Sequence, residues 1–276
     1  MSAEIQQRAG SFGSRVAAHA RFFLDAVKLN LQITLEYRGP FISQVFGMLL
    51  NDVMWVTFWV LYFGRFPVLN GWRIEDVLTI WAITGAGFGL GLGFFGNVQQ
   101  LPRIIAQGEL DYYLALPKNV LLHVLISKMD LPALGDILFG FGLFAAFLHP
   151  TPERILLFVV LALCGGMVFI GFFIVLGSLA FWMGNTEGLA LQVFNGLVTL
   201  STYPTPLFHG VVKLIMFTVV PAWFVAHLPT ALLQRFDWGS FLIEIGFAAG
   251  LLAGAVWLFY RGLRRYESGS LMVLRS

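Results

Sequence analysis

The stretch "ITGAGFGLGLGFFG" (residues 83–96) decides the fold, because it carries no charge and repeats glycine at helical spacing. Small residues four apart lie on one face of a helix and let a second helix approach closely in lipid. The glycines four apart form two series: Gly85, Gly89 and Gly93, and Gly87 and Gly91. Residues 91–96 also match G-x-G-x-x-G, but a dinucleotide site needs a strand before this motif and a helix after it. We therefore predict a membrane helix whose glycines serve packing.

The composition of the whole chain agrees with a membrane environment. Of 276 residues, 58% are hydrophobic and 12% are charged, whereas a soluble domain carries about 25% charged residues. The net charge of +2 does not indicate a nucleic-acid partner. The single cysteine, Cys164, excludes a disulfide within the chain and a thiol metal site. We predict an all-α polytopic membrane protein with a single transmembrane domain over residues 1–276.

Apolar segments long enough to span a bilayer recur along the chain, since a spanning helix needs about 20 apolar residues. The first fifteen residues hold no apolar core, so we expect no cleavable signal peptide and expect the first span to direct insertion. The six predicted spans are residues 41–63, 77–98, 131–148, 155–182, 188–208 and 240–260.

The distribution of basic residues predicts the orientation of these spans. Arg and Lys are enriched on the cytoplasmic side of membrane proteins. With six spans, the two terminal regions and the 99–130 loop hold twelve of the 17 basic residues, and the other side holds five. We therefore expect both termini and the 99–130 loop to be cytoplasmic.

Two further segments fit no simple span. Residues 15–38 predict an interfacial amphipathic helix that ends at Gly39-Pro40, because apolar and charged residues occupy opposite faces. Its predicted apolar face is Ala20, Phe23, Leu24, Val27, Leu31 and Leu35. Residues 211–234 are long enough to cross, but Pro221 and Pro229 interrupt them, and a seventh span would place the arginine-rich tail outside. We expect a re-entrant or interfacial helical hairpin on the outer face.

Polar residues within the predicted spans are candidates for a substrate pathway. Asp52 lies beside Asn51 near the middle of the first span, Asp136 lies in the third, and Glu244 lies in the last. An ionised group at the bilayer centre costs roughly 2.5–3.5 kcal/mol, so it usually faces a cavity or a partner. Asn51, Asp52 and Asp136 are therefore substrate-path candidates, for a polar or cationic substrate or a proton relay. The alternative explanation of the same residues is interhelical hydrogen bonds or a protonated acid.

The sequence offers no catalytic constellation. The five histidines are scattered, without a metal-binding spacing such as H-x-x-x-H, so we expect no metal site. The phosphate-binding motif G-x-x-x-x-G-K-[ST] does not occur, so ATP-driven transport needs its ATPase on another polypeptide.

The segment between the second and third predicted spans is longer than a simple connection. "LPRIIAQ" (101–107) predicts a short helix with Pro102 in its first turn and Gly108 as a left-handed end. A second short turn follows in "ELDYYLAL" (109–116), with Leu110, Tyr113 and Leu114 together. This cytoplasmic elbow is either a docking surface or an interfacial loop anchored by aromatics.

Three motifs in order make the chain resemble the integral-membrane subunits of ABC-2-type transporters, in a six-span permease group with a type V exporter-like fold. "GELDYYLALP" (108–117) is similar to that group's cytoplasmic segment. "YPTPLF" (203–208) and "IMFTVVPAWFVAHLP" (215–229) are similar to its outer-face region, and "RRYESGS" (264–270) is similar to its tail. Gln107 and Leu116 depart from the pattern, because the family places basic residues there.

The resemblance implies an assembly and roles for the elbow. It implies a second permease, identical or a sibling, and a dimer of cytosolic ABC ATPases that binds ATP and Mg, so this chain holds no cofactor and is not itself an enzyme. It also implies export across the inner (cytoplasmic) membrane of a bacterium. The elbow becomes a coupling helix seated in the ATPase, and its expected coupling residues are Leu101, Arg103, Ile104, Gln107, Gly108, Glu109, Leu110, Asp111, Tyr112, Tyr113 and Pro117.

Two other classes stay open at this stage. A self-contained secondary transporter or channel would favour inverted repeats and paired broken helices, which the sequence does not display. A membrane-embedded enzyme would need a convergent polar cluster. Many aromatics and few intramembrane charges fit a hydrophobic or amphipathic substrate, such as a drug-like cation, a lipid or a peptide.

Overall fold

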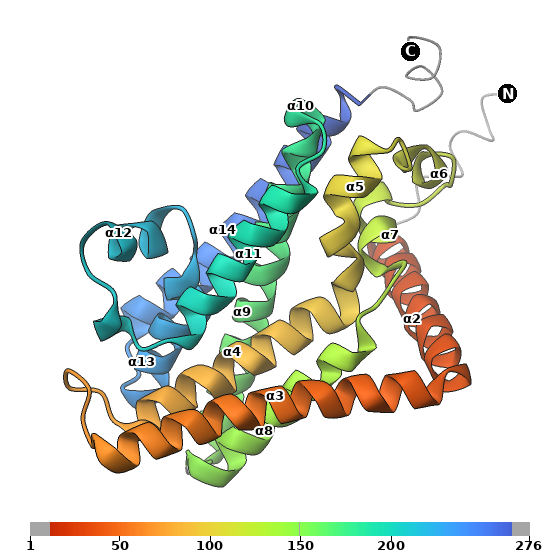
Figure 1. Ribbon diagram of the computed structural model, residues 1–276. Coiled ribbons are helices and arrows are strands. Elements are labelled where there is room, and N and C mark those ends of the chain that lie inside the picture. Colours follow the sequence, from red (N-terminus) through yellow and green to blue (C-terminus); the bar gives the residue numbers. More distant parts are fainter. Residues whose placement is uncertain (1–11, 149, 267–276) are drawn as a thin grey trace, which may run out of the picture.

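The protein is an all-α bundle, described by a computed structural model over residues 12–148 and 150–266 (Figure 1). The long helices are α2 (Phe12–Glu36), α3 (Arg38–Arg65), α4 (Ile74–Phe95), α8 (Leu134–Phe147), α9 (Pro152–Ser178), α11 (Glu187–Thr202) and α14 (Trp238–Leu263). The short helices are η1 (Gly96–Gln100), α5 (Leu101–Ala106), α6 (Leu110–Leu114), α7 (Val120–Ile126), η2 (Leu131–Ala133), α10 (Ala180–Met183), η3 (Thr205–Leu207), α12 (Gly210–Thr218), η4 (Trp223–His227) and α13 (Leu228–Gln234).

Helices α4 and α9 form the centre of the bundle. Helix α4 packs against α8 and α9, and α9 packs against α14 on its other side. In α4 and α9, most of the most apolar stretch of the helix is buried within the chain. In α3 and α14, only 11% and 17% of the corresponding stretch is buried. The exposed sides of α3 and α14 carry large apolar residues, which suits contact with lipid or with another membrane subunit.

Glycines set the distance between the central helices, as the sequence predicts. A Cβ atom on Gly91 would lie 3.0 Å from the carbonyl oxygen of Gly166 on α9, and one on Gly140 would lie 2.5 Å from the carbonyl oxygen of Ala82. The contact at Gly91 is tighter than an ordinary van der Waals contact, and the one at Gly140 leaves no room for a side chain unless the backbone shifts. The packing role of the "ITGAGFGLGLGFFG" stretch is thereby confirmed.

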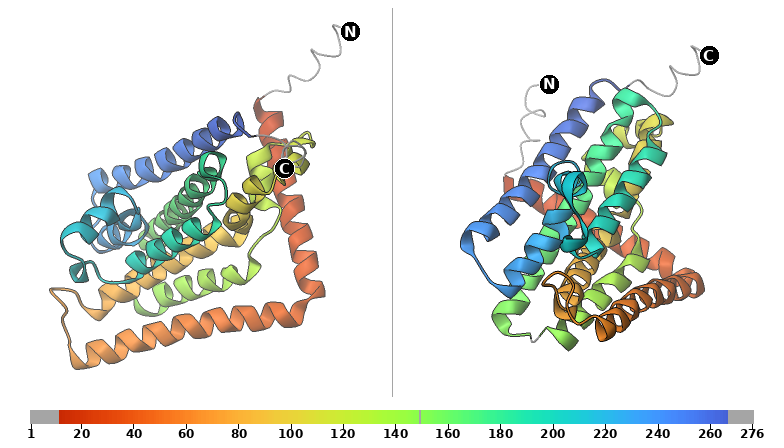
Figure 2. Two further views of the ribbon diagram at one scale, coloured as in Figure 1. Left: turned by 45° about the horizontal axis from the view of Figure 1, so that its top comes forward. Right: turned by 60° about the vertical axis from the view of Figure 1, so that its left-hand side comes forward.

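The helices run between two ends of the molecule, and polar contacts hold each end together (Figure 2). At one end, the Gln234 side chain donates a hydrogen bond to Asp76 at the start of α4. Arg154 at the start of α9 donates to the carbonyl oxygen of Leu233 at the same end. At the opposite end, the Tyr260 hydroxyl near the end of α14 donates to Asn119 before α7 at 3.0 Å. The 101–117 elbow and the 211–234 segment therefore lie at opposite ends.

The all-α polytopic class is confirmed, but the six-span count is not. Among the described residues, four helical runs are long and apolar enough to cross a membrane: residues 38–65, 74–106, 152–183 and 238–263. The pair α7 and α8, bent by 74°, makes a fifth if it is one span. Helix α11 has 16 residues, because Pro204 and Pro206 follow and proline cannot donate the next backbone hydrogen bond. The predicted span 188–208 is therefore α-helical only to Thr202, and the short helix η3 follows after the break.

The corner between α2 and α3 differs from the prediction. Helix α2 ends at Glu36, and Gly39 and Pro40 belong to the first turn of α3 instead of ending α2. A proline fits there because the first backbone N–H groups of a helix have no partner within it. Helix α2 then turns sharply away from α3 (Figure 1), which suits a helix lying along the membrane surface beside a spanning one.

The segment before α14 folds as broken helices. Helix α12 ends at Thr218, and Pro221 lies in the break before η4. Pro229 does not interrupt the chain, because it falls in the first turn of α13 directly after η4. His227 of η4 is buried, and its Nε2 lies 3.2 Å from the carbonyl oxygen of Leu200 on α11. The predicted re-entrant position of this segment stays a prediction.

Candidate functional site

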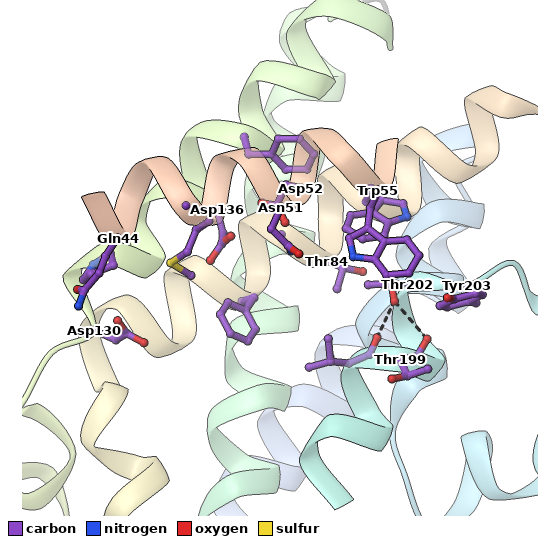
Figure 3. Close-up of a pocket in the computed structure, with 18 residues that line it drawn as sticks. Gln44, Asn51, Asp52, Trp55, Thr84, Asp130, Asp136, Thr199, Thr202 and Tyr203 are labelled. Carbon is purple, nitrogen blue, oxygen red and sulfur yellow. Dashed lines mark hydrogen bonds between the residues drawn. The ribbon is translucent and has the colours of Figure 1, made fainter. Parts of the chain in front are cut away.

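A cavity of about 750 Å³ lies between α3, α4, α8 and α11 (Figure 3). Its size falls in the range of pockets for drug-sized molecules. Its polar lining comes from Gln44, Asn51, Asp52, Thr84, Asp130, Asp136, Thr199, Thr202 and Tyr203. Its apolar lining comes from Gly47, Met48, Trp55, Trp81, Gly85, Phe88, Pro132, Phe139 and Val198. The three predicted substrate-path residues, Asn51, Asp52 and Asp136, therefore lie together on one cavity, and their role in transport stays a prediction.

Two carboxyl groups meet across the seam between α3 and α8. Asp52 is 9% exposed and Asp136 is 6% exposed, and their side chains are close enough to interact with each other. An ionised carboxylate only accepts hydrogen bonds, so a hydrogen bond between the two needs one proton on the pair. The Oδ2 atom of Asp136 is buried and has no hydrogen-bond partner in the described part of the chain. The pair therefore has unused capacity to bind a donor or a cation.

The fold explains why Asp136 is placed there. Asp136 lies in the first turn of α8, where the partial positive charge of the helix N-terminus favours a nearby negative group. Gly135, the preceding residue, lies at the contact with α3, since a Cβ atom there would be in van der Waals contact with the Val45 side chain, at 3.4 Å. The start of α8 thus brings a carboxyl group against the middle of α3.

Aromatic side chains form the other half of the lining. Trp55 stacks on Trp81 with ring centroids 6.2 Å apart and meets the ring of Tyr203 edge-on at 6.2 Å. Figure 3 places Gln44 and Asp130 at one end of the cavity, Trp55 and Tyr203 at the other, and Asp52 between them. The cavity therefore has an acidic half and an aromatic half.

Several lining residues were missed from the sequence, although one signal could have found them. On α3, Gln44, Met48, Asp52 and Trp55 follow spacings of four, four and three residues, which places them on one helix face. Asp130 had no such signal, because it lies outside the predicted spans, just before η2. Among the described residues that line the cavity, none is basic.

The predicted coupling region folds as an elbow of α5, η1, α6 and α7 at one end of the bundle. Gly108 has a positive φ of 77°, as predicted for the residue that ends α5. Four expected coupling residues are buried and attach the elbow to the bundle: Leu101, Ile104, Gly108 and Leu110. Helix α5 packs directly against α9 and α10. A force on the elbow would therefore reach the central helix α9.

The remaining expected coupling residues form the outer surface of the elbow. Those that are exposed are Gln107, Glu109, Tyr112 and Pro117, while Arg103, Asp111 and Tyr113 are half-buried. Arg103 and Glu109 form an ion pair at 3.9 Å, which contributes little to stability because both side chains are partly exposed. The exposed set is free to meet a partner.

The tail motif lies against the elbow motif. Burial and the nearby charge of Asp111 raise the pKa of Tyr266 to about 12, so these residues of "RRYESGS" and "GELDYYLALP" are close in space. The last residues of the tail motif, 267–270, and both chain ends lie outside the described residues.

The amphipathic helix α2 contacts the protein through part of the predicted apolar face, Phe23 and Val27, together with the neighbouring Phe22 and Ala26. Phe22 meets the His123 ring edge-on at 5.2 Å, and Phe23 stacks on Phe95 at 5.8 Å. Asn30 accepts a hydrogen bond from the backbone N–H of Met129. The predicted apolar residues that stay exposed are Ala20, Leu24, Leu31 and Leu35. One apolar stripe thus packs on protein, and a second is left for the membrane interface.

Other candidates lie away from the cavity. Glu244 on α14 is fully buried, beside Cys164 of α9, and neither of its carboxyl oxygens has a hydrogen-bond partner among the described residues. Within residues 12–148 and 150–266, no group of three or more His, Cys, Asp or Glu side chains could hold a metal ion.

Comparisons with known proteins identify a family for this chain. Residues 49–270 match a protein family described as "ABC-2 family transporter protein". The match covers most of the chain, including the elbow, α14 and all of the cavity lining except Gln44, Gly47 and Met48. No curated protein and no solved structure matches the chain.

Proposed function

Because this chain belongs to the ABC-2 family of transporter proteins, we propose that it is the membrane permease of an ATP-driven ABC exporter. In this proposal it moves a hydrophobic or amphipathic substrate out of the cell, and a separate cytosolic ATPase dimer supplies the energy. The observation that carries the proposal is the family match over residues 49–270, together with an elbow that is anchored inside the bundle and exposed outside it.

The chain needs an ATPase partner because it has no phosphate-binding loop of its own. ATP and Mg²⁺ would bind to that partner, and the elbow would be the contact between the two proteins. Its exposed side carries Gln107, Glu109 and Tyr112, and its buried side carries Leu101 and Ile104 against α9. Closure of the ATPase would push the elbow, and α9 would carry this movement into the centre of the bundle.

The cavity between α3, α4, α8 and α11 is the proposed substrate site. It combines an apolar wall with a few polar groups, which is the usual composition of a small-molecule site. Helix α3 forms one wall and packs loosely on the bundle, so a second permease, identical or a sibling, is proposed to complete the pathway on its exposed side. Both termini are proposed to be cytoplasmic, in a bacterial inner membrane.

The first test of this function is a co-purification. The tagged chain is extracted gently from its native membrane, and the proteins bound to it are identified by mass spectrometry. An ABC ATPase in equal amount to permease is the expected result, and a second permease sequence would distinguish a sibling from an identical copy. No ATPase, under conditions where another ABC complex stays intact, would contradict the proposal and favour a self-contained transporter.

The second test is Glu109→Lys, which reverses a charge on the exposed side of the elbow. We expect the complex to assemble, but substrate-stimulated ATP hydrolysis to fall to about the unstimulated rate, because the variant repels whatever basic group Glu109 meets. Glu153→Lys is the matched control, since Glu153 is also exposed but lies in the first turn of α9 at the opposite end. Normal coupling in Glu109→Lys would remove this residue from the ATPase contact.

A further inference from the structure

The strongest unexplained feature of the molecule is the charge of the cavity lining. Asp52, Asp130 and Asp136 all line the cavity, and among its described lining residues no Lys, Arg or His balances them. The aromatic half is built from Trp55, Trp81 and neighbouring rings. A site of this kind repels anions and attracts cations, because its only ionisable side chains other than Tyr203 are carboxyl groups.

From this arrangement we infer that the cavity selects a lipophilic organic cation, held by the Asp52–Asp136 pair at its charge and by the Trp55–Trp81 pair at its apolar body. This inference rests on the proposed transport function and names the class of substrate that the same site takes. The site is more than a group of neighbouring carboxylates, because the Oδ2 atom of Asp136 is buried at the cavity wall and has no hydrogen-bond partner among the described residues.

The two halves of the cavity match the two parts of such a molecule. The faces of aromatic rings carry partial negative charge and attract organic cations within about 6 Å. An ammonium or phosphonium group with aromatic substituents could therefore use the rings of Trp55 and Trp81 without losing contact with Asp52. A neutral lipid would leave the carboxyl groups without a partner, and an anionic one would be repelled by them.

Balance of charge also predicts the fate of the proton. One proton on the Asp52–Asp136 pair allows a hydrogen bond between the two groups. When a monovalent cation enters, the pair can release this proton to water and bind the cation with the same net charge in the cavity. The other titratable groups that line the cavity are Asp130, just before η2, and Tyr203, after α11; α4 contributes none to the lining.

The test compares two ions of equal shape and opposite charge. Tetraphenylphosphonium and tetraphenylborate are added to the purified full chain in nanodiscs of zwitterionic phosphatidylcholine, and empty discs correct for partition into lipid. We expect saturable binding of tetraphenylphosphonium only. Asp52→Asn and Asp136→Asn should each weaken it about tenfold, because each removes a carboxylate from the site.

The controls keep the result interpretable. Glu244→Gln removes a buried carboxyl group outside the cavity lining, so it should leave binding unchanged. Asp136→Glu keeps the charge and should bind tetraphenylphosphonium with an affinity within about threefold of that of the parent chain. Both Glu244→Gln and Asp136→Glu must elute as one peak on gel filtration. Equal or tighter binding of tetraphenylborate, or phosphonium binding that both asparagine variants leave intact, would overturn the inference.

This experiment is separate from the test of the transport function. If the chain co-purifies with an ABC ATPase but binds tetraphenylborate more tightly, the proposed function stands and the inference of a cationic substrate is wrong. If the chain binds tetraphenylphosphonium through Asp52 and Asp136 but co-purifies with no ATPase, the cation site stands and the ATP-driven mechanism is wrong.

Discussion

Helix α8 packs against two neighbours in two different ways. Toward α4 the backbones touch, since a Cβ atom on Gly140 would lie 2.5 Å from the Ala82 carbonyl oxygen and one on Gly89 would lie 2.6 Å from that of Ala133. Toward α3 the seam holds two carboxyl groups and part of a cavity of about 750 Å³. The contact between α8 and α4, here the α4 seam, fixes the position of α8. The contact between α8 and α3, the α3 seam, leaves space beside it. A permease needs both, because a pathway must open against a wall that does not move.

The largest effect is expected from closing the space in the α4 seam. Gly140→Ala puts a methyl group against the backbone of α4, and overpacking of this kind costs about 1–3 kcal/mol or more. We expect the thermal midpoint of the purified protein to fall by about 5 °C or more, as followed by tryptophan fluorescence in detergent.

Gly142→Ala is the matched control for this change, because it lies on the same helix and has nothing within 4 Å of the added methyl group. Alanine favours a helix over glycine by about 1 kcal/mol, so the control should keep or slightly raise the midpoint. Equal midpoints for the two variants would show that the α4 seam has more room than the structure gives it.

The next effect is expected at the carboxyl pair in the α3 seam. Asp136→Leu leaves Asp52 buried without its partner, and an unsatisfied buried polar group costs about 1–3 kcal/mol. Asp52→Leu should destabilise similarly, whereas the double variant should be nearly as stable as the parent, because no polar group is then left alone.

A double-mutant cycle measures this difference as a coupling energy of about 1–3 kcal/mol. Asp52→Leu combined with Gly140→Ala serves as the control cycle, in which the two losses should add. Additive losses for the two aspartates would mean that they do not form a pair in the folded protein.

The two seams also differ in how far the sequence predicts them. The glycine spacing of residues 83–96 predicts close packing, because a missing side chain has a direct steric consequence in any helix pair. It does not name the partner, since Gly140 and Gly166 lie in other apolar segments with glycines of their own. The fold class follows from composition alone, because it depends on the proportions of apolar and charged residues and not on which helices pack together.

The cavity is harder to predict because it depends on pairing. The sequence predicts Asn51, Asp52 and Asp136 as substrate-path residues, but only the fold brings α3 against the start of α8. Trp55 could have been added by helical spacing, whereas Asp130 could not, because its position depends on the break between α7 and η2. The six-span count is not confirmed, for a similar reason: apolarity marks residues 188–208, but the prolines end the α-helix at Thr202.

A smaller effect is expected from pH, and it sharpens the difference between the seams. If a cation replaces one proton on the Asp52–Asp136 pair, then its affinity rises with pH, by at most about tenfold per pH unit, because one proton leaves for each cation that binds. Tetraphenylphosphonium titrations between about pH 6 and about pH 8 measure the slope. Asp52→Asn removes the shared proton and should flatten it. An unchanged slope in this variant would assign the proton to another group, such as Asp130.

The smallest effect is expected from the aromatic half of the cavity. Trp55→Leu keeps every charge and removes one of the two stacked rings, so tetraphenylphosphonium should bind about threefold more weakly, in line with a cation–π contribution of about 0.5–1 kcal/mol. Trp257→Leu is the control, because Trp257 is exposed on α14 and does not line the cavity. The pH slope should survive in Trp55→Leu, since the carboxyl pair is intact. A loss of both affinity and slope in that variant would mean that Trp55 holds α3 in place, so that the α3 seam depends on aromatic packing as the α4 seam depends on glycine.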